Sequence, residues 1–130
     1  MHALRNIHAA LVPDAILVDT QPVSADPAIA ADGTELGALD MHDWLETIDA
    51  LEERIADTIA AGLYEPLHEQ HFTVTDTFDS GAECFDTVIC WRGTRVPAAL
   101  TARIRAAQPP VTVAQEVRLR LLRRVPSPCD

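Results

Sequence analysis

Two histidines, His68 and His71, stand three residues apart in the segment HEQH. If this segment were helical, both imidazoles would face one metal ion, with Asp76 or Cys84 as a further ligand. However, the segment lacks the H-E-x-x-H spacing of zinc proteases and leads into an alternating, strand-like stretch, which turns the two side chains to opposite faces. We therefore expect solvated or structural histidines, and we assign no metal site.

The three cysteines, Cys84, Cys90 and Cys129, form no C-x-x-C pair, and their number is odd. A disulfide framework does not suit this pattern, so reduced thiols are expected. Cys84 and Cys90 fall on a predicted amphipathic helix with no histidine nearby in the sequence. A thiol without an activating base at such a position normally packs in the core, so no nucleophile is predicted.

His8 and Asp19 flank the first predicted strand. Asp19 lies toward its carboxyl end, which is where α/β sheets place ligands. The two tryptophans, Trp44 and Trp91, are interpreted as anchors of the core or of an interface, because an indole on an apolar helix stripe needs no ligand to explain it.

Charge is distributed unevenly along the chain. The first ninety residues hold eighteen Asp and Glu against two Arg, whereas the remaining forty hold eight Arg against two acids. With a net charge of −10, nonspecific nucleic-acid binding is disfavoured, because it depends on summed positive charge. Arg118 and Arg120 share a strand face. We expect them to pair with Glu116 or with the acidic helix over residues 40–62 rather than to hold an anion.

The elements that position these residues follow from hydrophobic spacing. Helical spacing over residues 4–11 predicts a helix that a Pro-Asp turn ends, and the apolar run 15–18 predicts a central strand covered on both faces. An Asp-Gly turn at 32–33 predicts a short hairpin. Five later elements are expected: a helix over 40–62 that Gly62 ends, a half-buried strand over 71–78, a helix capped by Ser80 and Glu83, a helix beginning at Pro97, and a terminal strand over 111–124.

The terminal strand VTVAQEVRLRLLRR alternates for most of its length. Its predicted apolar face carries Val111, Val113, Val117, Leu119 and Leu121. Fourteen residues would reach about 46 Å, which is longer than most strands, so a bulge or break is expected near Gln115.

The stretch ALRNIHAALVPDAILVD, from Ala3 to Asp19, resembles a phrase of class I S-adenosylmethionine-dependent methyltransferases. In that family leu-arg-x-ile-his-x-x-leu-x-pro-gly-gly precedes the fifth strand, and Asp14-Ala15 stands here in place of Gly-Gly. GTELGALD, FDTVICWRGTRVPAAL and VRLRLLRR are similar to the end of bacterial proteins of that type. The resemblance covers most of this chain but only about half of the family's fold.

This resemblance implies an α/β fold, in an α+β-like truncated form that matches the C-terminal half of a Rossmann-like methyltransferase. We expect a small mixed sheet of about three main strands plus a short hairpin, with three to four helices. The terminal strand would lie between the first strand and the strand over 71–78. The length suits one domain with one core, assigned to residues 1–124, and a disordered tail over 125–130.

The resemblance lacks the family's cofactor half. The glycine-rich loop and the ribose-binding carboxylate would lie upstream of Met1, and the sequence leaves open whether Met1 is the biological start. The five glycines present are scattered, with no G-x-G pattern. We therefore carry over no catalytic, cofactor-binding or metal-binding residue, and we expect no cofactor.

Three hypotheses follow. The first is a non-enzymatic, methyltransferase-like remnant that acts as a structural or interaction module and forms a homodimer through an exposed sheet edge. The alternative is the substrate-side part of a methyltransferase whose cofactor-binding half is missing or supplied by a partner. A third, a small-ligand or metal-binding module, rests on His68, His71 and Asp19. Without a signal peptide or a long apolar run, a cytoplasmic location with no membrane or nucleic-acid partner is expected.

Overall fold

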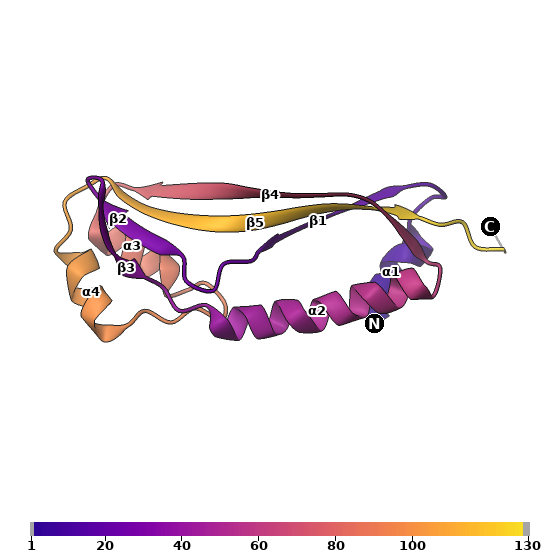
Figure 1. The fold of residues 1–130 in the computed structure, drawn as a ribbon, viewed down its shortest axis with the longest axis horizontal. Helices are drawn as coiled ribbons and strands as arrows, with labels where there is room; N and C mark the ends of the chain where they lie inside the picture. Colours follow the sequence, from indigo (N-terminus) through magenta and orange to yellow (C-terminus); the bar gives the residue numbers. More distant parts are fainter. Residues whose placement is uncertain (1, 129–130) are drawn as a thin grey trace. The chain divides into compact units, whose positions relative to one another are not determined.

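The computed structural model describes residues 2–128, and Cys129 lies outside this part. Within it the chain forms four helices and five strands, which is a mixed α and β arrangement of the predicted general class (Figure 1). In chain order the elements are α1 (His2–Ala10), β1 (Ile16–Pro22), β2 (Ala28–Ala31), β3 (Thr34–Ala38), α2 (His42–Ala60), β4 (Tyr64–Phe78), α3 (Gly81–Val88), α4 (Ala98–Arg105) and β5 (Val111–Arg124).

The strands belong to one hydrogen-bonded sheet in the order β1-β5-β2-β3, and β4 also pairs with β5. β2 runs antiparallel to β5, with Ala28 opposite Ala114 and Ala31 opposite Val111. The predicted neighbours of the terminal strand, the first strand and β4, are confirmed. The predicted hairpin is confirmed as β2 and β3, and it joins the same sheet through β5.

The chain divides into two compact units. The first unit takes residues 1–21, 48–71 and 118–130, and the second takes 22–47 and 72–117. Each unit has its own cluster of buried hydrophobic residues, instead of the single core expected from the chain length.

The first unit is organised around the buried residues Ile55, Tyr64 and Leu122, against which several leucines pack. The Tyr64 hydroxyl donates a hydrogen bond to the Leu4 carbonyl at 2.9 Å. His8, which is 7% exposed, meets the Tyr64 ring edge-on with 5.5 Å between the ring centres. These contacts attach α1 to the rest of this unit.

The second unit has the larger core, to which β2, α3, α4 and the first half of β5 all contribute. Its buried members are Ile29, Ala31, Leu39, Met41, Phe78, Cys84, Val88, Leu100, Ile104, Val111 and Val113. Trp44 and Trp91 are partly buried and pack against this cluster, so both tryptophans are anchors of the core as predicted.

The predicted helix and turn signals act as expected. The Asp40 carboxylate accepts a hydrogen bond from the backbone N–H of His42 at 3.0 Å at the start of α2, and Gly62 ends that helix with φ +76°. Ser80 Oγ accepts from the backbone N–H of Glu83 at 3.1 Å, which caps α3.

The predicted burial of two strands is wrong. β1 was expected to be covered on both faces, yet Ile16 and Val18 are 45% and 57% exposed. Ile16 and Val18 are two residues apart and so lie on the same face of β1, which is open to solvent. β4 begins earlier than predicted, at Tyr64, and is exposed for most of its length, including Val74 at 36%. It is not the half-buried strand that its alternation indicated.

β5 has its predicted length, but its predicted apolar face continues only through Val117. From Arg118 onward the buried positions fall on even numbers, and Leu119 and Leu121 are only partly buried. The strand itself is continuous from Val111 to Arg124, so the break predicted near Gln115 is not present, and what changes after Val117 is which positions are buried. The cause of this change is that the arginine side chains of the second half turn inward to ion pairs, as described below.

Gly93 fixes the turn after α3. Its φ is +72°, and a Cβ added there would come within 2.7 Å of the backbone nitrogen of Trp44. Gly33 in the hairpin has a similar φ of +77°, but a Cβ there would meet nothing within 4 Å. The two glycines thus differ in close packing and not in backbone conformation.

We predict that Gly93→Ala is much more destabilising than Gly33→Ala. Gly33→Ala should cost about 1–2 kcal/mol of unfolding free energy, which is the strain of a left-handed alanine. Gly93→Ala should cost at least about 3 kcal/mol, because the same strain is joined by a clash with the Trp44 backbone. Urea unfolding of both variants checks this, and equal losses would contradict the close approach.

Candidate functional site

Four charged side chains meet in the first unit. Arg120 Nη2 lies 2.9 Å from Asp19 Oδ2 and 2.8 Å from Glu52 Oε1. Arg118 Nη2 donates to the same Glu52 oxygen at 2.5 Å. Asp19, Arg118 and Arg120 have side chains that are only 10 to 12% exposed, whereas Glu52 is 35% exposed. We call these four residues the arginine cluster.

The arginine cluster contains two cations and two anions, so it is neutral as a whole. Burial lowers the pKa of Arg120, but hydrogen bonds from its guanidinium to Asp19 and Glu52 outweigh that effect and raise it overall. The prediction that these arginines pair with the acidic helix is confirmed, since Glu52 lies on α2. Asp19 is occupied by Arg120, and it also accepts from the Gln21 amide at 3.1 Å. The cluster is therefore a structural contact, and Asp19 is not a free ligand group.

The histidines hold separate positions. His68 and His71 both lie on β4 and are exposed, and their odd spacing in a strand directs them to opposite faces. His68 Nε2 lies 3.4 Å from Gln70 Oε1, and His71 Nε2 lies 3.6 Å from Glu69 Oε2, both on the same strand. His8 Nε2 lies 3.0 Å from the Val125 carbonyl oxygen. Across residues 2–128, no group of three His, Cys, Asp or Glu side chains is arranged to hold a metal ion.

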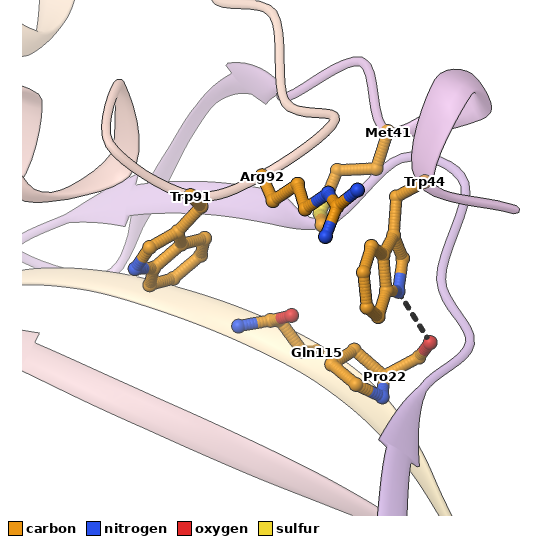
Figure 2. Close-up of a pocket in the computed structure, with 6 residues that line it drawn as sticks. All are labelled: Pro22, Met41, Trp44, Trp91, Arg92 and Gln115. Carbon is orange, nitrogen blue, oxygen red and sulfur yellow. Dashed lines mark hydrogen bonds between the residues drawn. The ribbon is translucent and has the colours of Figure 1, made fainter. Parts of the chain in front are cut away.

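A pocket of about 260 Å³ opens in the second unit (Figure 2). Its six lining residues come from four places in the chain: Pro22 at the end of β1, Met41 and Trp44 at the start of α2, Trp91 and Arg92 after α3, and Gln115 on β5. Figure 2 shows the two indole rings standing on opposite sides, with the Arg92 and Gln115 side chains between them. We call this site the tryptophan pocket.

Polar groups in the tryptophan pocket differ in whether they have partners. Trp44 Nε1 donates to the Pro22 carbonyl at 3.0 Å, which fixes that indole and leaves its ring face to the pocket (Figure 2). Gln115 is only 8% exposed, and its side-chain amide makes no hydrogen bond with any residue in the described part of the chain. The amide is not itself sealed from solvent, since the buried side-chain atoms that lack a hydrogen-bond partner in the described part of the chain are Thr94 Oγ1 and Arg118 Nε, so Gln115 presents an open donor and acceptor to the pocket.

The segment after α3 is held against the start of α2. Asp40 and Arg95 exchange two backbone hydrogen bonds of 2.9 and 2.7 Å, and Arg95 Nη2 lies 2.9 Å from Asp43 Oδ2. The Asp40 carboxylate accepts hydrogen bonds from the backbone N–H and from the ring of His42. These bonds, the backbone one first, lower the pKa of Asp40, so Asp40 stays ionised at this helix start. With the close approach of Gly93 to Trp44, these bonds set the spacing of the two indoles.

Sequence reasoning did not identify this pocket. Trp44 and Trp91 were predicted as anchors only, and Arg92 was not singled out. The available signal was Gln115, which interrupts the apolar face that Val113 and Val117 continue on either side. A glutamine at an inward-facing strand position needs a partner, and that need is the feature a binding site would create.

Comparison with known proteins gives no further guidance on the site. No protein-family model, no curated protein and no solved structure matches this chain. Among the helices of residues 2–128, none is both long and apolar enough to cross a membrane.

The two cysteines within residues 2–128 differ in environment. Cys84 is fully buried in α3, which confirms its predicted core position, and burial, followed by the charge of Glu83, raises the pKa of its thiol to about 11. Cys90 is exposed, and its Sγ donates to the Asp86 carbonyl at 3.4 Å. The predicted core position of Cys90 is wrong, because α3 ends at Val88 and Cys90 falls in the turn that follows.

We predict that Cys90 reacts with a thiol reagent and that Cys84 does not. With Cys129 replaced by serine, Ellman's reagent at pH 8 should titrate one thiol quickly in the folded protein. Only about one in a thousand Cys84 side chains is thiolate at that pH, given its raised pKa, and burial excludes the reagent. The second thiol should appear on unfolding in urea. Two equally fast thiols in the folded protein would contradict the burial of Cys84.

Proposed function

We propose that this protein is a small-molecule binding module and that the tryptophan pocket is its binding site. The observation that carries the proposal is the Gln115 amide, which lines the pocket and makes no hydrogen bond with a described residue, although the residue is only 8% exposed. A hydrogen bond between this amide and a ligand would contribute about 0.5–1.5 kcal/mol. A ligand that hydrogen-bonds to the amide accounts for glutamine at a position where valine or leucine would suit the fold.

The size and lining of the pocket limit what it does. Sites for drug-sized ligands occupy roughly 300–1,000 Å³, so 260 Å³ suits a smaller molecule with about one ring. Pro22, Met41, the two indoles, Arg92 and Gln115 include no side chain suited to accept a proton or act as a nucleophile near neutral pH. The pocket is therefore equipped to bind and orient a ligand, and binding rather than catalysis is the function proposed.

We predict that Gln115→Met stabilises the fold but weakens ligand binding. Methionine has a similar size and replaces the polar amide of a residue that is only 8% exposed with an apolar group, so the free energy of unfolding should rise by about 0.5–1 kcal/mol. Binding of phenylacetamide, a neutral single-ring probe, should weaken about three- to tenfold because one hydrogen bond is lost. The chain contains two tryptophans, both in the pocket, so their two indole N–H signals in a ¹⁵N–¹H spectrum report binding at this site.

Gln108→Met is the matched control. Gln108 is exposed in the same unit, so the same chemical change there should leave both binding and stability nearly unchanged. A Gln115→Met variant that is destabilised and binds the probe as well as the wild type would show that Gln115 serves packing and not a ligand.

A second candidate function is the methyltransferase-like interaction module, in which two copies associate through the β1 edge. The pairing of β5 with both β1 and β4 supports this candidate, because the resemblance requires the terminal strand between those two. The position of β1 at the end of the strand order, with Ile16 and Val18 exposed, supplies an apolar edge for a second copy. The alternative on the same observation is the substrate-side part of a methyltransferase completed by a partner.

We predict that Val18→Lys abolishes a dimer that Val12→Lys leaves intact. A lysine on the exposed edge opposes strand pairing, whereas Val12 is 70% exposed in the turn before β1. Light scattering on a size-exclusion column should give twice the 14.2 kDa chain mass for the wild type and for Val12→Lys, and the single mass for Val18→Lys. A monomeric wild type would contradict the interaction module. Heat on titration with S-adenosylmethionine would favour the methyltransferase alternative.

A further inference from the structure

Arg92 is the charged group of the tryptophan pocket, and it is exposed. The other arginines of the second unit have partners. Arg95 pairs with Asp43 at 2.9 Å, Arg103 donates to the Leu36 carbonyl at 3.1 Å, and Arg105 lies 4.4 Å above the centre of the Phe85 ring. Arg92 makes no ion pair or side-chain hydrogen bond with a residue in the described part of the chain.

Among the arginines of the second unit, Arg92 is the one without such a partner within residues 2–128, although the chain has a net charge of −10 and acids outnumber cations by two to one. A carboxylate is therefore easily supplied by the protein itself, as it is for Arg95 and Arg120. Beside a pocket, such a guanidinium is available for an anionic group of a ligand, to which it offers paired N–H donors in a planar arrangement. It also repels cations, which disfavours the quaternary ammonium compounds that aromatic cages often bind.

The two indoles indicate the remaining part of the ligand. Trp44 has its N–H occupied by Pro22, so it contributes an aromatic face rather than a donor. Trp91 stands on the opposite side of the pocket (Figure 2). Flat rings gain favourable stacking or edge-to-face contacts with indoles, in addition to the burial of apolar surface.

We infer that the tryptophan pocket binds a small aromatic acid: its ring contacts Trp44 and Trp91, its anionic group pairs with Arg92, and a polar substituent reaches the Gln115 amide. This inference rests on the proposed binding function and adds the charge and ring character of the ligand. The acid group is a carboxylate here, and a phosphate ester of similar size offers the same chemistry to Arg92.

Three probes with the same ring and different charge test the inference. Phenylacetate is anionic, phenylacetamide is its neutral isostere, and 2-phenylethylammonium is cationic. Each is titrated into the full chain at low ionic strength, and binding is followed through the two indole N–H signals. Phenylacetate should bind about tenfold more tightly than phenylacetamide, since hydrogen bonds to a charged group are roughly twice as strong as neutral ones, and the cation should bind most weakly. Phenyl phosphate in place of phenylacetate shows which anion is preferred.

Arg92→Gln should remove the preference for the anion, so that phenylacetate and phenylacetamide bind equally. Arg54→Gln changes the net charge by the same amount at an exposed site in the first unit, and it should preserve the preference. If the neutral or cationic probe binds as tightly as phenylacetate, the inference about the ligand is overturned while the binding function stands. If none of the probes shifts the indole signals, both are overturned.

Discussion

The sheet depends on the backbone hydrogen bonds of β5. Within residues 2–128, β1, β2 and β4 all pair with this strand, and β3 joins through β2. The side chains of β5 are also covered along nearly its whole length, since its one exposed position is Glu116. The two halves achieve this differently. Val111 and Val113 enter a hydrophobic cluster in the second unit, whereas Arg118 and Arg120 enter the arginine cluster in the first.

The arginines of β5 explain why its pattern was only partly interpretable. Alternation of apolar and polar residues predicts one buried and one solvated face; through Val117 the odd positions are buried as predicted, while Thr112 and Ala114 on the other face are partly buried and Glu116 is exposed. Beyond Val117, the charged face is buried because Asp19 and Glu52 neutralise Arg118 and Arg120. A buried, paired charge has the same sequence signature as an exposed one, so only the position of α2 decides between them. The sequence supported the pairing itself, through the contrast between the acidic first part and the arginine-rich end.

Turns and caps were predicted more reliably from the sequence than the burial of the strands was. The hairpin at Asp32-Gly33, the cap at Ser80 and the helix end at Gly62 depend on a few neighbouring residues, and all three formed as predicted. The exposure of Val18 and Val74 depends on which elements cover a strand, and apolar residues on an edge strand look like those in the middle of a sheet. The tryptophan pocket combines residues from four separate segments. No spacing rule could bring Arg92 and Gln115 together, although a glutamine among inward-facing valines was a visible irregularity.

Gln115 and the arginine cluster place polar groups beneath the surface in different ways. The arginine cluster pairs its charges within the protein and leaves Arg118 Nε buried without a hydrogen-bond partner in the described part of the chain. The Gln115 amide makes no hydrogen bond with a described residue and opens to the pocket instead. Ligand present at one hundred times its dissociation constant would stabilise the native state by about 2.7 kcal/mol, whereas one hydrogen bond to the amide contributes about 0.5–1.5 kcal/mol. On the proposed binding function, Gln115 therefore orients the ligand, and the indoles and the rest of the lining supply most of the stabilisation.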